Sequence, residues 1–385
     1  MPRSNSSTFS SKQPTPGAHQ LRQFYGPTAR TLVWTVIALA IIDAFIGLEF
    51  RMPADPQANP SALQRYFDYG RSIEGKLRRM VGRTPAQDAP IIAAGWLGEE
   101  CDVDTRELRG KLVFDIYGMS FTNQIADEME AADPGLASQR FGGPAAPPSH
   151  SYACFSRRVS GRRHVAPIQI IGVLASSVSR MQTLSGLTTS FEVPEPFTYP
   201  RYTLGSDGRL QAEMPSITSR SELHAALAEP QLWHAFVAQL RNDDSFYAEH
   251  VFQADIFDHS VLGRLLRRAW GQRTLRERTN ALRPEQGFVG APDIVSTLGA
   301  MLLDFGEKAR NSAGRPVVIL LEDRGYGRTL SEMLTHALRE NSIDFVATSA
   351  IVPAGDSANF LPDGHFTPVA NEKIAAAVLA VLGRR

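Results

Sequence analysis

Two short motifs, about 245 positions apart, carry side chains that can perform acyl transfer. The first, VFDIYGMSFTNQIADEM, contains Ser120, and the second, LPDGHFTPVANEKIAAAVLAVL, contains Asp363 and His365. A hydroxyl is a weak nucleophile until a base removes its proton, and an imidazole oriented by a carboxylate can be that base. These three side chains are the minimum set for acyl transfer through a covalent ester on Ser120.

The first motif predicts a strand, a tight turn and a helix. An apolar run at 112–116 is followed by Gly118, which permits a sharp turn, and then by apolar residues at helical spacing. Ser120 would lie at the carboxyl end of the strand, where the first helical N–H groups favour a developing negative charge. In the alternative interpretation, Ser120 only caps the helix.

The second motif predicts a bent loop that leads into the last helix. Asp363 and His365 are two positions apart, so an extended chain points them to one side, and Gly364 lets the chain bend until carboxylate and imidazole meet. Thr367 is the expected N-cap and Pro368 the first helical residue. In the alternative interpretation, His365 only binds a loop carbonyl.

Strands and helices are expected to alternate along the core of the chain. The strands are expected near 111–117, 137–142, 167–174, 316–322 and 343–349, and the helices near 121–132, 149–159, 293–311, 327–340 and 368–382. Such alternation predicts an α/β fold, in which helices cover both faces of a parallel sheet. Ligands bind beyond the carboxyl ends of such strands, so Ser120, Gly143, Ser176 and the 350–365 loop are expected to converge there.

On these motifs the chain resembles the SGNH, or GDSL-like, hydrolase superfamily over roughly residues 110–185 and 315–385. Gly118-Met119-Ser120 stands where that family has Gly-Asp-Ser, and Asp363-Gly364-His365 stands just before the last helix. Met119 and the Asp-x-His spacing favour the branch that acetylates exported polysaccharides such as alginate. The resemblance implies a three-layer α/β/α, flavodoxin-like parallel sheet and the catalytic residues Ser120, His365 and Asp363.

The resemblance also implies where the oxyanion is held. The family uses the N–H of the nucleophile, a glycine after the second strand and an asparagine after the third. Here Gly143 or Gly142 occupies the glycine position, whereas Ser176 and Ser177 follow the third strand in place of asparagine. A serine hydroxyl can donate one hydrogen bond, and without that donor the chain would bind acyl groups but turn them over slowly.

The first 50 residues predict a membrane anchor. Four basic residues and no acid precede an apolar run at 32–48, interrupted only by Asp43, so this carboxylate either lies near the far interface or is paired. A cleaved signal peptide is the alternative, but no small-x-small site follows the run. The basic flank favours a cytoplasmic N-terminus and a bacterial inner-membrane protein with a periplasmic catalytic domain.

These features divide the chain into four segments. We expect a disordered tail at 1–30, an anchor at 31–50, a linker at 51–105 and a catalytic domain at 106–385 with an insertion at 186–290. Charges of the amphipathic piece at 63–81 are expected to be solvated. The insertion is expected to contain a hairpin turn at 205–208, then helices, and its aromatic residues either line a glycan cleft or form a core.

Composition excludes several other classes of protein. The 385 residues are 43% hydrophobic with zero net charge, so no basic surplus indicates a nucleic-acid partner. Histidine spacing indicates no metal site, and the sequence predicts no cofactor. Cys101 and Cys154 both lie on the side predicted to be exported, where a disulfide is permitted but not required.

Together these observations predict a membrane-anchored serine esterase or O-acetyltransferase. Its expected substrate is an acyl ester, most simply acetyl, of an exported polysaccharide, and its possible partners are a membrane-bound acetyl donor and polysaccharide export proteins. The sequence does not separate esterase from transferase, because the outcome depends on whether water or a sugar hydroxyl resolves the ester. The other class that stays open is a glycan-binding scaffold of an exopolysaccharide assembly with weak catalysis.

Overall fold

A parallel five-stranded sheet forms the centre of the molecule. The computed structural model describes residues 18–55, 58–81, 95–101, 110–161 and 165–383. The sheet has the order β2-β1-β3-β6-β7, and every neighbouring pair is parallel. Its strands are β1 (Leu112–Tyr117), β2 (Leu136–Phe141), β3 (Ile168–Leu174), β6 (Arg315–Leu321) and β7 (Asp344–Ala347). The predicted α/β class is confirmed, and each strand boundary lies within two residues of its expected position.

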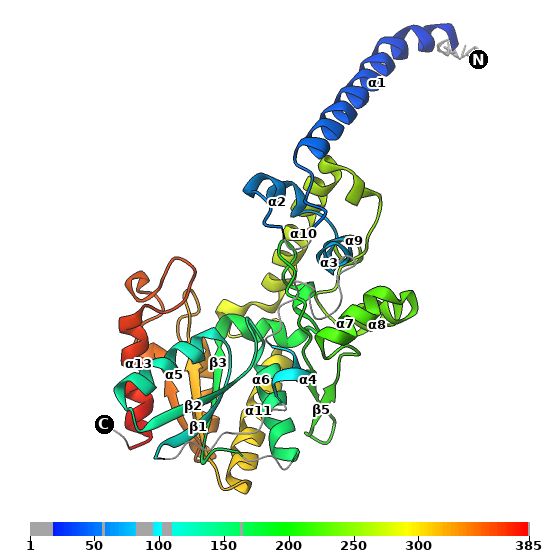
Figure 1. The fold of residues 1–385 in the computed structure, drawn as a ribbon. Coiled ribbons are helices and arrows are strands. Elements are labelled where there is room, and N and C mark those ends of the chain that lie inside the picture. Colours follow the sequence, from blue (N-terminus) through cyan, green and yellow to red (C-terminus); the bar gives the residue numbers. More distant parts are fainter. Residues whose placement is uncertain (1–17, 56–57, 82–94, 102–109, 162–164, 384–385) are drawn as a thin grey trace, which may run out of the picture.

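Helices cover both faces of this sheet (Figure 1). Residues of α5 (Ser120–Ala132) and α13 (Pro368–Val381) pack in one hydrophobic cluster, and those of α6 (Pro148–Ser160), α11 (Pro292–Asn311) and α12 (Thr329–Glu340) pack in another. The strands supply both clusters because successive side chains point to opposite faces. In β6, for example, Val317 and Ile319 belong to the α5/α13 cluster and Val318 and Leu320 to the other.

The order of the strands indicates where a ligand would bind at the edge of the sheet. Chain connections leave β1 toward β2 on one side and toward β3 on the other, as in flavodoxin-like sheets. In such sheets, ligands bind beyond the carboxyl ends of the strands at this point of divergence. The carboxyl end of β1 leads directly into Ser120, so the fold presents this serine at the expected position.

The insertion packs against the segment that follows the apolar helix. A third hydrophobic cluster joins Leu77 and Trp96 to Phe197, Phe236 and many other insertion residues. The helices and strands concerned are α2 (Ala62–Asp68), α3 (Ile73–Val81), α4 (Leu97–Glu100), the hairpin β4 (Arg201–Leu204) and β5 (Leu210–Glu213), α7 (Arg220–Ala228), α8 (Pro230–Asp243), α9 (Glu249–Phe252) and α10 (Val261–Leu282). Short 3₁₀ turns complete the chain: η2 (Ala175–Gln182), η3 (Gly186–Thr188), η4 (Ile256–His259), η5 (Pro284–Gln286), η6 (Thr348–Ala350) and η7 (Ser357–Asn359). The expected turn at 205–208 is confirmed.

Charged side chains of α2 and α3 are paired rather than solvated, contrary to the expectation for 63–81. Asp68 is 3% exposed and binds Arg71, Arg79 and Arg264. Lys76 is also buried, and its Nζ donates to the carbonyl oxygens of Tyr69 and Phe191. Burial lowers the pKa of Lys76 to about 7. The expectation fails because an amphipathic pattern does not reveal that α10 will supply partners.

Aromatic residues of the insertion form a core and do not line a glycan cleft. Phe197, Tyr199, Trp233 and Phe236 are each at most 2% exposed, and Phe191, Phe246 and Tyr247 are buried as well. Trp270, 55% exposed, and Phe257, 42% exposed, are exceptions, and the Trp270 ring stacks on His250. The core interpretation is therefore the correct one for the buried residues, because burying an aromatic ring stabilises the fold strongly.

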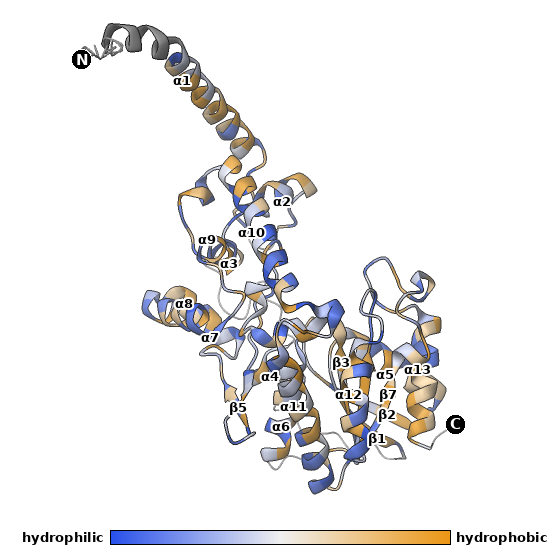
Figure 2. Ribbon diagram, turned by 180° about the vertical axis from the view of Figure 1, so that it is seen from behind, coloured by the Kyte–Doolittle hydropathy of each residue, from blue (hydrophilic) through white to orange (hydrophobic). Residues whose placement is uncertain are grey.

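The apolar segment forms a helix that projects away from the rest of the molecule (Figures 1 and 2). This helix, α1, covers Ala18–Glu49, so it begins earlier than the predicted boundary at residue 31. The earlier start is favourable because each residue added to an existing helix gains one backbone hydrogen bond. Residues 1–17 of the predicted tail lie outside the described residues. Thr28–Glu49 is long and apolar enough to cross a membrane by length and composition, and the rest of the chain buries none of its most apolar part.

A disulfide joins Cys101, at the end of α4, to Cys154 in α6, 53 positions later in the chain. The sequence had left this pairing open. Both cysteines are fully buried in the hydrophobic cluster that contains residues of α6, α11 and α12. The bond therefore attaches the segment that precedes β1 to the sheet domain.

Replacing Cys101 with Ser is expected to lower the free energy of unfolding by about 4 kcal/mol, because a cross-link across a loop of this length restricts the unfolded chain. Urea unfolding of the variant, and of the native protein with and without reductant, measures the loss. Reductant should shift the native midpoint and leave the variant unchanged. An identical midpoint for variant and native protein would contradict the expectation.

Candidate active site

Ser120 begins helix α5 directly beyond the end of strand β1. Met119 is the N-cap residue of this helix, and Ser120 is the first helical residue. The Ser120 hydroxyl therefore does not cap α5, and the capping interpretation is wrong for this residue. Its backbone N–H has no acceptor among the described residues, as is usual at the start of a helix. Ser120 thus combines a half-buried hydroxyl with a free N–H at the positive end of a helix.

The Ser120 hydroxyl lies within hydrogen-bonding distance of the His365 ring. The distance from Ser120 Oγ to His365 Nε2 is 2.8 Å. The two residues are 245 positions apart in the chain, so only tertiary folding brings them together. With Nε2 unprotonated, the serine donates its proton to the ring, which is the geometry needed for activation of a nucleophile.

A tight turn sets the position of His365. Gly364 N–H donates to the Leu361 carbonyl, and Leu361 N–H donates to the His365 carbonyl. Gly364 has φ +93°, a backbone conformation that glycine adopts without steric cost. Thr367 then accepts from the N–H of Ala370 as the predicted N-cap of α13. The bend expected at Gly364 and the cap expected at Thr367 are both confirmed.

Asp363 lies on the other side of the imidazole, but it is held loosely. Its Oδ2 is 3.2 Å from His365 Nδ1, and its Oδ1 accepts from the backbone N–H of His365. The Nδ1 contact lacks the direction of a hydrogen bond, because Nδ1 has no hydrogen-bond partner among the described residues. The backbone hydrogen bond from His365 lowers the pKa of Asp363, so this carboxylate is ionised at neutral pH. Asp363 is therefore an exposed anion within reach of the ring.

Phe121 holds the imidazole from the side, a contact that sequence reasoning missed. Its ring stacks on His365 with centroids 4.6 Å apart and an angle of 19° between the planes. Phe121 also contacts Phe366 edge to face. The residue directly after the nucleophile thus restricts rotation of the base, and the aromatic residue at this position was the available signal.

Gly142 and Gly143 lie beside the nucleophile turn, as expected for the glycine position. The β1–β2 pairing continues past the strand end, since the Gly118 N–H donates to the Phe141 carbonyl. A Cβ on Gly142 would lie 1.8 Å from the Gly118 carbonyl oxygen, and one on Gly143 would lie 2.5 Å from the Gly95 Cα. Both positions therefore require glycine. The N–H of Gly143 has no acceptor within the described part of the chain.

Ser176 and Ser177 follow β3 as expected, but their donors are largely occupied. The Ser177 hydroxyl donates to the Leu174 carbonyl, so it is not available to an oxyanion in this conformation. The backbone N–H of Ser176 donates to Asp323, a residue at the end of β6 that sequence analysis did not identify. Burial raises the pKa of Asp323. The Ser176 hydroxyl also interacts with the Asp323 carboxylate and limits this rise, so neither serine offers a free third donor in this conformation.

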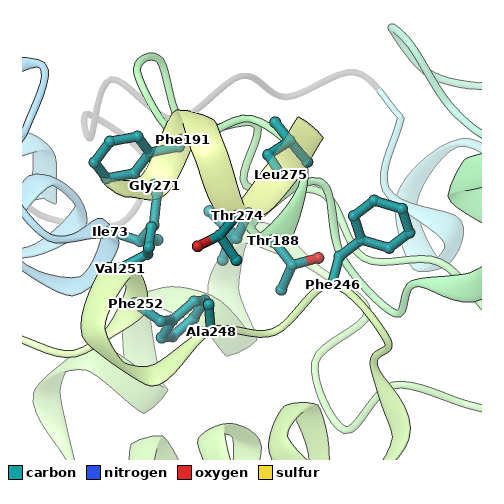
Figure 3. Close-up of a pocket in the computed structure, with 11 residues that line it drawn as sticks. Ile73, Thr188, Phe191, Phe246, Ala248, Val251, Phe252, Gly271, Thr274 and Leu275 are labelled. Atoms are coloured by element: carbon teal, nitrogen blue, oxygen red, sulfur yellow. The ribbon is translucent and has the colours of Figure 1, made fainter. Parts of the chain in front are cut away.

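A buried histidine and a small cavity lie outside this site and have no catalytic features. His150 is fully buried, burial lowers its pKa to about 4, and its ring contacts Tyr199, so it is a neutral core residue. A cavity of about 20 Å³ is lined by residues of α3, α9, α10 and the loop near Phe191. Figure 3 shows that its lining is mostly apolar. This volume holds roughly one water molecule and is too small for an acyl chain.

Asp363→Ala is expected to lower kcat for ester hydrolysis by roughly 10²-fold, less than loss of a fully buried triad acid, because solvent already screens this carboxylate. Steady-state kinetics with an activated acetyl ester measures the change. Asp356→Ala is the matched control, since that exposed carboxylate caps η7 in the same loop. Equal rates for the Asp363 variant and the native protein would remove Asp363 from the mechanism.

Comparison with known proteins adds no family assignment. No protein-family model matches the chain, and neither a curated protein nor a solved structure matches it significantly. The chemical interpretation therefore depends on the arrangement of its own residues. A hydroxyl, an imidazole and a carboxylate meet beyond the carboxyl end of β1, and this set suits acyl transfer.

Proposed function

We propose that this protein is a membrane-anchored, extracytoplasmic serine enzyme of SGNH type that acts on acyl esters of a polysaccharide, with acetyl as the acyl group. The observation that carries the proposal is the 2.8 Å contact between Ser120 Oγ and His365 Nε2. Ser120 lies beyond the end of β1 in a sheet of order β2-β1-β3-β6-β7, and this position supports the same proposal. The resemblance of both motifs to SGNH hydrolases supplies the substrate class.

The mechanism begins with attack of Ser120 Oγ on the acyl carbonyl carbon. His365 Nε2 accepts the hydroxyl proton as the C–O bond forms, and the ionised Asp363 stabilises the resulting imidazolium. In this proposal the N–H groups of Ser120 and Gly143 donate to the oxyanion, since neither has a backbone acceptor among the described residues. Collapse of the tetrahedral intermediate expels the sugar alkoxide, which takes the proton from His365. The product of this half-reaction is an ester on Ser120.

The second half-reaction decides between esterase and transferase. Water attacking the acyl-enzyme gives the free acid, whereas a sugar hydroxyl gives a new ester, and His365 removes the proton of either attacker. The side chain of His365 is 25% exposed and that of Asp363 64%, so both attackers have access from solvent. Nothing in this open geometry favours one acceptor over the other.

The experiment that tests the proposal follows the acetyl group of p-nitrophenyl acetate with the purified full-length chain. Release of acetate that depends on Ser120 supports an esterase, and transfer to added oligosaccharide supports a transferase. Covalent labelling of Ser120 by a fluorophosphonate is a second readout that does not require the natural substrate. Neither turnover nor labelling, with a correctly folded protein, would reject the proposal.

A glycan-binding scaffold is the second candidate function. It is favoured by the occupied donors at Ser176 and Ser177, which leave the oxyanion with two backbone groups. Removal of one oxyanion donor typically slows an enzyme by roughly 10²- to 10³-fold. Under this alternative the chain binds oligosaccharide in calorimetry and shows no labelling of Ser120.

A further inference from the structure

Asp43, the acid within the apolar run, accepts two hydrogen bonds from the start of helix α10. Its Oδ1 accepts from the backbone N–H of Leu262 at 2.6 Å and from the hydroxyl of Ser260 at 3.0 Å. Ser260 is itself the N-cap of α10 and accepts from the N–H of Gly263. Because the first turn of α10 contains no acid, Asp43 supplies the anion that a helix N-terminus favours. Asp43 therefore joins α1 to α10.

A close approach of the two helices reinforces this junction. A Cβ on Gly47 would lie 3.5 Å from Val261 Cγ2, so α1 and the start of α10 are in contact distance there. Asp43, Ile46 and Gly47 are the half-buried residues of α1 between 31 and 49, and the others in that range are exposed. Only one short face of α1 thus contacts the rest of the chain. The remaining apolar surface is free for lipid.

The junction sets the position of α10 along the normal of a membrane that α1 crosses. Thr28–Glu49 contains 22 residues, which at 1.5 Å per residue spans about 33 Å, close to the roughly 30 Å of a hydrocarbon core. Asp43 is six residues before Glu49, which is about 9 Å along the helix. The start of α10 therefore lies at the level of the outer leaflet and not in the water beyond it.

The residues that precede α10 include exposed apolar side chains, which a location at the lipid interface favours. Ile256 is 79% exposed and Phe257 42% exposed, in the turn η4 directly before Ser260. Two large apolar side chains exposed side by side on a short turn are unfavourable in water. On α2, which packs against α10, Leu63 and Tyr66 are also exposed.

We propose that η4 inserts Ile256 and Phe257 into the outer leaflet interface of the same bilayer that α1 crosses. This inference depends on the membrane anchoring in the proposed function and adds a second point of attachment, whose partner is the phospholipid bilayer. Arg264 and Arg268 follow on α10, where they pair with Asp68 and Glu192. Leu266, 68% exposed on the same helix, extends the exposed apolar surface that begins at Ile256.

Two attachment points restrict rotation of the molecule about α1. The start of α13, which follows His365, lies on the side of the sheet domain from which α1 departs, whereas the C-terminus lies on the opposite side (Figures 1 and 2). Attachment at both α1 and η4 therefore holds the edge that carries Ser120 and His365 at a constant height and orientation above the membrane. An acyl ester near the membrane surface would reach this edge more readily than a distant one.

The test uses the full-length chain in vesicles of phosphatidylethanolamine and phosphatidylglycerol, labelled with an environment-sensitive fluorophore. Ile256→Cys carries the label at the proposed contact. Val289→Cys is the matched control, because Val289 is 62% exposed and lies beyond the far end of α10. We expect blue-shifted emission at 256, mostly quenched by brominated lipid, and water-like, unquenched emission at 289.

Flotation of the same samples separates the two claims. If the chain floats with vesicles but the label at 256 reports water, this inference is overturned while the anchoring stands. If the chain does not float, the anchoring itself is wrong. Asp43→Ala adds a second readout: we expect the variant to float like the native chain and to lose most of the blue shift at 256. A retained shift in that variant would show that Asp43 does not set the contact.

Discussion

Ser120→Ala lowers kcat for hydrolysis of an activated acetyl ester by roughly 10³-fold or more. The reason is that no other described hydroxyl lies within hydrogen-bonding distance of His365 Nε2. We expect a loss below the largest values known for serine enzymes, because the donors of Ser176 and Ser177 are occupied and would not stabilise the native transition state. Stopped assays at saturating ester, with active sites counted by fluorophosphonate, measure kcat directly.

Folding must be unchanged for this result to report chemistry. Ser120→Ala removes one hydrogen bond from a half-buried side chain, so its free energy of unfolding should fall by no more than about 1 kcal/mol. Ser296→Ala is the control, since this exposed residue binds only carbonyls in the first turn of its own helix α11. A Ser120 variant that keeps native activity would contradict the covalent mechanism.

His365→Ala is expected to cost as much as Ser120→Ala, and the double variant should cost no more than either single one. A nucleophile and its base act as a unit, so removing either already abolishes activation, and the losses are not additive. The 2.8 Å contact between the two side chains is the structural basis of this coupling. Rates of the two single variants and the double variant, measured with one ester, complete the cycle.

The control for the second prediction is another surface histidine. His336 on α12 contacts only Glu340, four residues later on the same exposed face, so His336→Ala should keep the native rate. Additive losses in the double variant would mean that His365 acts independently of Ser120. In that case the ring would have a loop role, and the alternative interpretation of His365 would be correct.

Local patterns in the sequence were sufficient for the elements of the sheet domain. Buried strands such as β3 and β6 are continuous apolar runs, and Gly118, Gly364 and Thr367 specify turns and a cap through their own conformational preferences. These signals depend on residues close in the chain, so they can be found without knowing the fold. The positions of Ser120 and His365 relative to the alternating strands and helices could likewise be found from the sequence.

Only the tertiary structure decided which distant groups meet. Asp43 finds its partners at Ser260 and Leu262, Asp68 is neutralised by Arg264, and the Ser176 N–H is taken by Asp323. Each pairing joins groups from residues more than 100 positions apart, and a charge in the sequence does not indicate whether water or a distant residue will balance it. The sequence by itself determined the chemical groups and the elements that carry them. Folding determined their contacts, because these depend on packing between segments that no local pattern encodes.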